Sequence, residues 1–411
     1  MSPALPFDII ALIIDIAGEN KDKDLLKKLA LVSSIFHPIC SKYLFADVEV
    51  DDANLTQHKP SSKGFVKLLE SRPDVVKHIR KLSYSLDDRF QSPQPSRLDE
   101  DDHLLSCILP KSLRTIPHLN FLEIYASGLD WNTLDSSITS AFLHLMHLPT
   151  INRIDLTFIN NFPVSGLIPC VNLLRLDIFQ MECVKEGPSP VFVVQSEIMP
   201  KIRELYISEA FLLMVKLLLA RMQNGQPAFR FTNLRLLSIS ITRIEEKRIF
   251  QYLLLNARCL QKLIVSTGQD QTLAGLHVIL SPRARTLKIL ELAVFLYSRG
   301  SVRLPLGGFC EELEKMAGNN MLEVLSFEVY VGVYDREDFI GPIIQNVEKV
   351  LVKPGWSALR QVSLTVSCLE QLKPEDGAKF IEALKSLPEK YLSHLSKLES
   401  VAFHYTINWM H

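Results

Sequence analysis

One short apolar pattern, apolar-x-x-apolar-x-apolar, recurs along the chain and constrains its fold more than any other feature. Eleven copies lie between residues 79 and 403, from Ile79/Leu82/Tyr84 to Leu398/Val401/Phe403, with first positions about 32 residues apart on average. The last two apolar positions of each copy alternate as in a short strand, in which side chains two residues apart share one face. Such a strand cannot bury its apolar face alone, so the copies are expected to stack around one continuous core.

Between the copies lie segments whose apolar residues recur at helical spacing. They cover residues 211–222, 245–257, 309–317, 338–352 and 377–392. A strand followed by a helix, repeated, gives parallel strands joined by right-handed crossovers. We therefore predict an α/β fold over residues 49–411, an irregular leucine-rich-repeat solenoid with its strands on the concave side and its helices on the convex side.

Residues 87–103 interrupt this rhythm, because they are rich in proline, serine and acidic residues and lack an apolar face. We expect them to form a loop inserted into the solenoid. The alternative to the solenoid is an ordinary α/β domain in which leucines match the pattern by chance. Eleven copies between residues 79 and 403 disfavour that alternative.

Composition restricts the partners and the compartment. The hydrophobic share of 47% and charged share of 22% are those of a folded protein, and the net charge of −1 provides no field that attracts nucleic acid or an anionic membrane. The seven cysteines are scattered without CxxC spacing, which indicates reduced thiols in a cytoplasmic or nuclear protein. The apolar N-terminus lacks a basic segment and is interrupted by Asp8 and Asp15, unlike a signal peptide. No apolar run approaches the roughly 20 residues that span a membrane.

The motifs of common catalytic sites are absent from the sequence. It contains no glycine-rich phosphate loop, no GxSxG elbow and no kinase signature. His144 and His147 form an HxxH pair, but no third ligand stands in register with them. We therefore expect no catalytic residue, no bound cofactor and no metal, and a protein that is not an enzyme. An enzyme built on a leucine-rich body is the least supported alternative.

The N-terminus carries two apolar segments, residues 5–17 and 25–39, separated by a charged spacer. Apolar residues at helical spacing predict a helix in each. Pro6 suits the first turn, Gly18 is expected to end the first helix, and Asp24 is expected to cap the second. So small a module cannot bury all its apolar residues by itself, so either the repeats or another protein must cover them.

These residues resemble the F-box family, over a module expected to span residues 1–48. The matching positions are Leu5-Pro6, Asp8, Ile9-Ile10, Ile13-Ile14, Asp24-Leu25-Leu26, Val32-Ser33 and Phe36. The connector at residues 18–23 is longer than usual in the family, and Phe36 stands where tryptophan is common. The rest of the chain is similar to the divergent leucine-rich arrays of many fungal F-box-like proteins.

The resemblance implies a function and a set of partners. F-box modules dock on a Skp-type adaptor, which joins them to a cullin–RING ubiquitin ligase, while the rest of the chain selects a protein substrate. The implied adaptor-binding residues are Leu5, Pro6, Ile9, Ile10, Ile13, Ile14, Leu25, Leu26, Leu29, Val32, Ser33 and Phe36. The alternative is an interaction scaffold without a role in ubiquitin transfer, in which these helices only cap the repeat array.

A partner-binding face is also expected on the strands. The residue between the last two apolar positions of a copy points away from the core, which places Glu123, Asp155 and Asp177 on one face of neighbouring strands. We predict partner-binding residues at Glu123, Tyr125, Asp155, Asp177, Phe179 and Tyr206. The hypothesis is that the acids receive a basic segment of an unidentified protein partner. The alternative is a hydrated face balanced by nearby arginines such as Arg153 and Arg175.

Overall fold

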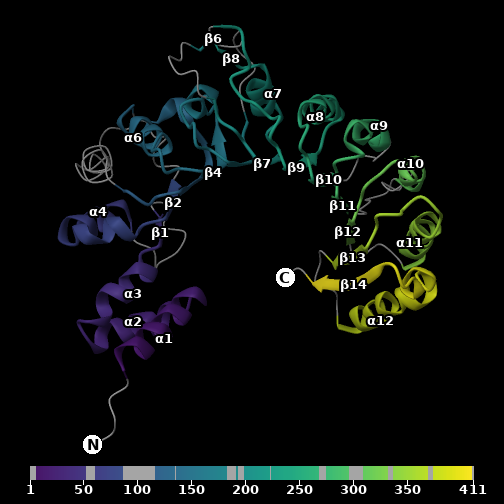
Figure 1. Ribbon diagram of the computed structural model, residues 1–411, viewed down its shortest axis with the longest axis horizontal. Helices are drawn as coiled ribbons and strands as arrows, with labels where there is room; N and C mark the ends of the chain where they lie inside the picture. Colours follow the sequence, from purple (N-terminus) through teal and green to yellow (C-terminus); the bar gives the residue numbers. More distant parts are fainter. Residues whose placement is uncertain are drawn as a thin grey trace, which may run out of the picture. The chain divides into compact units, whose positions relative to one another are not determined.

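The structure, a computed structural model, describes residues 6–51, 61–86, 116–134, 136–182, 191–192, 199–222, 224–267, 275–295, 309–331, 337–368 and 374–409 (Figure 1). The expected loop at residues 87–103 lies outside them. The chain forms two compact units, both mixed α/β. Unit 1 comprises Met1–Pro200 and Leu219–Phe229, and unit 2 comprises Lys201–Leu218 and Arg230–His411.

Unit 1 begins with three helices, α1 (Phe7–Glu19), α2 (Lys23–Val32) and α3 (Phe36–Leu44). They share a small core of their own, made by the buried residues Ile14, Ala17, Leu26 and Cys40. The second helix expected from the sequence, at residues 25–39, is in fact two helices, α2 and α3.

Two local signals explain the differences in the helical module. Asp22, not Asp24, caps α2, because its carboxylate accepts the backbone N–H of Leu25 at 3.0 Å while Asp24 lies inside the first turn. Pro38 does not end a helix but occupies the first turn of α3, where its missing N–H leaves no intrahelical bond unmade.

Gly18 also differs from its expected role as a helix terminator. It lies inside α1, and a side chain there would overlap the ring of Tyr43 on α3. The absence of a Cβ thus allows the two helices to approach closely, and the Tyr43 hydroxyl completes the contact by donating to Asp15 on α1 at 2.6 Å.

The remainder of unit 1 is a parallel sheet flanked by helices. Its strands pair in chain order, each with the next. They are β1 (Asp47–Asp51), β2 (Lys81–Leu86), β3 (Phe121–Asp130), β4 (Arg153–Asn160) and β5 (Arg175–Phe179). The helical segments are α4 (Ser62–Ser71), η1 (Pro73–His78), η4 (Trp131–Thr133), α6 (Ser136–Met146) and η5 (Val164–Leu167). A separate two-stranded pair is formed by β6 (Val191–Phe192) and β8 (Arg221–Met222). Strand β1 precedes the first copy of the pattern and begins before the expected boundary at residue 49.

Unit 2 repeats the same arrangement of strand and helix. Its strands, again parallel and paired in chain order, are β7 (Glu204–Ser208), β9 (Leu236–Ile241), β10 (Lys262–Thr267), β11 (Ile289–Phe295), β12 (Val324–Val331), β13 (Gln361–Cys368) and β14 (Ala402–Trp409). Its helical segments are α7 (Phe211–Leu219), α8 (Ile244–Asn256), α9 (Leu276–Leu280), η6 (Ser281–Arg283), α10 (Phe309–Met316), α11 (Glu337–Leu351), α12 (Pro374–Tyr391) and η7 (Leu395–Lys397). Helices α8 to α12 lie along one side of this sheet and leave its other face open (Figure 1).

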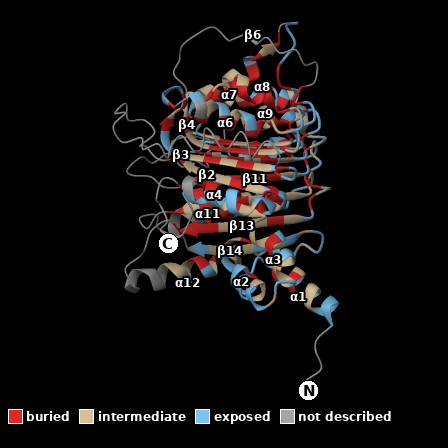
Figure 2. Cartoon of the chain, turned by 90° about the vertical axis from the view of Figure 1, so that its left-hand side faces the viewer, coloured by how far each residue is buried: buried red, intermediate tan, exposed pale blue. Residues whose placement is uncertain are grey.

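The recurring apolar pattern forms the core in ten of its eleven copies, in which all three apolar residues are buried. Buried and half-buried residues alternate along the strands, as in β2 and β13 (Figure 2). The last copy is shifted, because Phe403 rather than Val401 pairs with Val362 of β13. His404, and not Ala402, is therefore the residue in register with Ser363 on the open face. Among the described residues, no helix has the length and apolar character needed to cross a membrane.

Three buried glutamates hold the helical segments of unit 2 in place. Glu246 accepts backbone N–H groups at the start of its own helix, α8. Glu312 of α10 does the same for α9, where it accepts the backbone N–H of His277 at 2.9 Å. Glu348 of α11 accepts the N–H of His394 at 2.7 Å beside η7. Because Glu312 and Glu348 reach into a neighbouring repeat, each joins two repeats through a charge-assisted hydrogen bond.

Glu312 should make the stability of unit 2 depend on acid pH. Burial by itself would raise the pKa of Glu312, but hydrogen bonds from the side chain and backbone of His277 and from Lys315 lower it to about 2. A depressed carboxyl pKa stabilises the fold above the ordinary value of 4.5, and this contribution is lost as the pH falls from there through about 2. We expect Glu312→Gln to lower the free energy of unfolding by about 1–3 kcal/mol at pH 7.

The difference between wild type and Glu312→Gln should shrink as the pH falls through this window, measured by urea unfolding at a series of pH values. Glu314→Gln is the matched control, since Glu314 lies on the same helix but is exposed and pairs with Lys353. It should change the free energy of unfolding by less than about 1 kcal/mol. A Glu312→Gln protein that loses no stability at pH 7 would contradict the proposed anchoring role.

Candidate functional site

Helix α1 is apolar on two sides, and only one of them is packed. Ile10, Ile14 and Ala17 lie against the core of the module. A second stripe, also at helical spacing, faces outward and is exposed. It consists of Ile9, Leu12, Ile13 and Ile16, with Phe7 beside it. An isolated exposed leucine is ordinary on a protein surface, but a continuous stripe along a helix indicates an interaction surface.

The end of α2 and its connection to α3 expose further apolar side chains. Leu31, Val32 and Ile35 are exposed, and Leu31 is 88% exposed. The side chain of Ser33 holds the connection by accepting the backbone N–H of Ile35 at 3.3 Å. We call these three residues together with the exposed stripe of α1 the apolar surface of the module. Figure 2 shows the exposed residues of α1 and α2 in pale blue.

The structure divides the predicted adaptor-binding residues into two groups. Exposed members that fit a docking surface are Pro6, Ile9, Ile13, Leu25 and Val32. Members packed into or against the core of the module are Ile10, Ile14, Leu26, Leu29 and Phe36. Ser33 is half-buried in the connection, and Leu5 lies outside the described residues. The sequence analysis missed the exposed residues Phe7, Leu12, Ile16, Leu31 and Ile35. Both stripes of α1 consist mainly of isoleucine, so helical spacing alone could not tell which one is buried.

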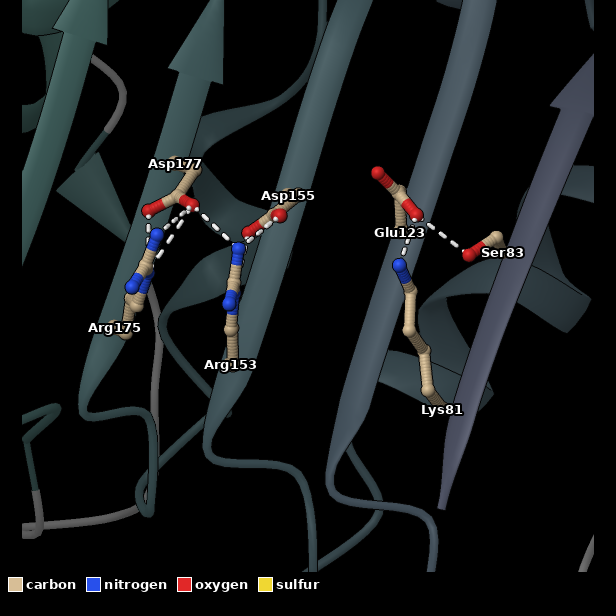
Figure 3. A network of polar contacts seen from close by, with 7 residues as sticks. All are labelled: Lys81, Ser83, Glu123, Arg153, Asp155, Arg175 and Asp177. Carbon is tan, nitrogen blue, oxygen red and sulfur yellow. Dashed lines mark hydrogen bonds and ion pairs between the residues drawn. The ribbon is translucent and has the colours of Figure 1, made fainter. Parts of the chain in front are cut away.

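The second candidate surface is the open face of the sheet in unit 1, where charged side chains form a network (Figure 3). Glu123 accepts Lys81 Nζ at 2.8 Å and the Ser83 hydroxyl at 2.5 Å. The guanidinium of Arg153 lies between two carboxylates, with Nη2 at 2.7 Å from Asp155 and 3.0 Å from Asp177.

Arg175 completes the network by binding the same Asp177 through Nη2 at 2.9 Å. Each of the three carboxylates therefore has a cationic partner on its own face, and the three acids balance the three cations Lys81, Arg153 and Arg175. This arrangement agrees with the alternative of a face balanced by Arg153 and Arg175.

The pKa values of Glu123 and Asp155 are shifted in opposite directions. For Glu123 burial by itself would raise the pKa, but the hydrogen bonds from Lys81 and Ser83 lower it below its usual value. For Asp155 burial raises the pKa above its usual range, Arg153 opposes this, and the nearby Asp177 adds to it through repulsion. Arg153 thus favours the charged form of Asp155, which burial and Asp177 disfavour.

The other residues predicted on the partner-binding face lie on neighbouring strands. Tyr125 and Phe179 belong to β3 and β5 and stand in register with Thr157 of β4 on the open face. Tyr206 belongs to β7 in unit 2, where it is half-buried and pairs with Ser238. Unit 1 therefore brings together five of the six predicted residues, all except Tyr206.

The described residues include no group of three or more histidine, cysteine, aspartate or glutamate side chains that could hold a metal ion. His147 of the HxxH pair instead forms a hydrogen bond through Nε2 with the carbonyl oxygen of Gly166 at 2.9 Å.

Comparisons with known proteins identify no family for this chain. No protein-family model matches the chain, and no curated protein matches it. Nineteen chains of solved structures match. One of them, a protein from Bacteroides fragilis, is 10% identical with a TM-score of 0.29, and the match covers 70% of this chain and 65% of that one. The chain thus spans less than two thirds of that protein, and a likeness of this size carries no conclusion about function.

Ile13 and Ile14 offer a direct test of the two stripes of α1, because they are neighbours of the same type with 43% and 0% exposure. Ile14→Ala should lower the free energy of unfolding of the module by about 2–5 kcal/mol through the cavity it leaves. Ile13→Ala should change it by less than about 1 kcal/mol. Hydrogen exchange of the α1–α3 amides in the intact chain measures both, and equal protection in the two variants would contradict the assignment.

A double-mutant cycle tests the charge network. Arg153→Met leaves the carboxylate of Asp155, which is 12% exposed, without its cation and should cost about 2 kcal/mol, between the values for surface and buried pairs. Asp155→Leu in the Arg153→Met background should recover part of this stability, because it removes the unpaired buried charge. Thermal unfolding of the four proteins gives the coupling energy, and additive effects would show that the pair is not coupled.

Proposed function

We propose that this chain is the substrate-recognition subunit of a Skp–cullin–F-box ubiquitin ligase, with no catalytic role of its own. The N-terminal module would bind a Skp-type adaptor and through it a cullin–RING ligase, and the repeats would bind a protein target. The observation that carries the proposal is the apolar surface of the module. A helix whose second apolar stripe is exposed gains stability only when a partner covers that stripe.

The packing within unit 1 favours docking over capping. A helix that caps a repeat array buries its apolar face on the first repeat. Here the module meets the repeats through α3, whose His37 lies 3.3 Å from Arg72 at the start of η1. The exposed stripe of α1 takes no part in that contact, since Ile9, Ile13 and Ile16 stay open to solvent. The capping alternative leaves this surface without a role.

Co-purification of the full chain with a Skp-type adaptor tests the proposal. The wild-type chain should form a stable complex, and the triple variant Ile9→Ser, Ile13→Ser and Val32→Ser should not. Each of these side chains is exposed in the free chain, so the variant should fold normally and retain the thermal stability of wild type. The loss of binding should exceed 100-fold, because interface anchors of this kind each contribute about 1–2 kcal/mol or more.

A matched control uses exposed apolar residues outside the module. Tyr252, Leu255 and Val278 of unit 2 are about as exposed as the three residues above. Their replacement by serine should leave adaptor binding unchanged. Absence of any complex with the wild-type chain would refute the proposal. A triple variant that unfolds at lower temperature, with no adaptor bound by either protein, would instead support the capping alternative.

A further inference from the structure

Beyond the charge network, the open face of unit 1 carries a row of three aromatic rings. The rings of Tyr125 and Phe158 meet edge to face with centroids 5.6 Å apart, and those of Phe158 and Phe179 do so at 5.7 Å. They come from the middle of β3, the second half of β4 and the last residue of β5. We call these three residues the aromatic row.

Phe158 reaches the open face only because its backbone departs from the strand. In β4 the side chains of Ile154 and Leu156 point into the core, so regular alternation would send Phe158 there as well. Instead Phe158 has a φ of 57°, which turns its ring outward to meet Tyr125 and Phe179, and Ile159 is buried in its place. A left-handed conformation is unfavourable for a bulky aromatic residue.

Such strain in a folded protein is often found at functional positions. The facing strand accommodates the change, since the pairing of β3 with β4 slips between Tyr125 and Leu129. The side chain of Asn160 also links the end of β4 to neighbouring segments by hydrogen bonds. Asn160 donates to the carbonyl of Gly128 at 3.2 Å, and its own side-chain oxygen accepts the N–H of Glu182 at 3.0 Å. The aromatic row therefore stands on a well-bonded framework.

The aromatic row is partly accessible to solvent on this face. Phe179 is 40% exposed, and Tyr125 and Phe158 are half-buried. The charged rows beside it are already neutralised by their own ion pairs. Phe121, a further aromatic residue of β3, is covered by the Lys81 ammonium at 4.6 Å and the Arg153 guanidinium at 4.0 Å from its ring centroid.

We propose that the aromatic row anchors an uncharged apolar segment of the target protein. The occupant follows from the charges, because a basic segment would have to displace Lys81, Arg153 or Arg175 from the carboxylates that they already bind. An apolar side chain that binds to the rings displaces only water. The charged residues beside the rings, already paired with one another, form the polar rim typical of such contacts. The inference rests on the proposed function in that the repeats select a protein target, but it does not depend on adaptor binding.

The experiment uses the full chain to select from a displayed library of random 12-residue peptides. The affinity of each selected peptide is then measured by fluorescence anisotropy. The aromatic row should select peptides with aliphatic, proline or aromatic anchors and no basic cluster. Their dissociation constants should change less than about 2-fold between 50 and 500 mM NaCl, since no ion pair forms on binding.

Two variants of the aromatic row test the assignment. Phe179→Ser should weaken binding at least 10-fold, as expected for a central aromatic anchor. Phe158→Gly should do the same while preserving the backbone, because glycine adopts a positive φ without strain. Tyr252→Ser is the matched control, since Tyr252 is also an exposed aromatic residue, 48% exposed on α8 of unit 2, and it should leave binding unchanged.

Several results would overturn the proposal. One is a library that yields no binding peptide, and another is a set of peptides whose affinity is unaffected by Phe179→Ser. A third is a set rich in lysine and arginine whose affinity falls with salt and with Glu123→Gln, which would restore the hypothesis of a basic segment. In each case adaptor capture by the N-terminal module is scored separately, so failure of the aromatic row and failure of the proposed function give different results.

Discussion

The rest of the structure depends on the stacking of successive strands, most of which place equivalent positions of the repeats in register. At the start of the strands, one carbonyl oxygen accepts two consecutive backbone N–H groups of the next repeat, as Asn120 does from Asn152 and Arg153 in unit 1. The same pair of bonds recurs in unit 2, where the carbonyl of Arg235 accepts Gln261 and Lys262. This pair of hydrogen bonds aligns each apolar position with the equivalent position of the next repeat. A single pattern in the sequence therefore builds a continuous buried layer.

The same register determines which side chains meet on the open face, because equivalent positions of neighbouring strands lie about 4.8 Å apart. In unit 1 it stacks Asp155 beside Asp177, an arrangement that is unfavourable until the guanidinium of Arg153 joins the two. In unit 2 the acid at the equivalent position, Glu291, stands between the uncharged residues Ile264 and Ser326. In unit 1 the register instead places acids of neighbouring strands side by side, and aromatic residues beside them.

Sequence reasoning succeeded where a residue pattern repeats and failed where the structure depends on a single contact. The buried strands and the five helices between them were predictable because their apolar periodicity is dictated by the core. Strand β1 follows the pattern through Phe45, Val48 and Val50 but lies before the first of the eleven copies, next to the helical module, and was not recognised. The left-handed backbone of Phe158 leaves no trace in the side-chain pattern. In the candidate docking site, periodicity identified α1 but not which stripe is buried. That choice depends on Gly18 and Tyr43, whose contact fixes how α3 lies against the helix.

The two stripes of α1 allow the module to form a core of its own and still expose an apolar surface. Among the described residues that core is built on four buried apolar side chains, so the free energy that holds the three helices together is small. Burying the second stripe on a partner removes further apolar surface from water, at about 25 cal/mol for each Å². A partner that binds only the folded module stabilises it by mass action, so binding and folding of these helices are coupled. Selection for a partner can therefore preserve apolar residues on the outside of α1 that selection for an isolated fold would replace.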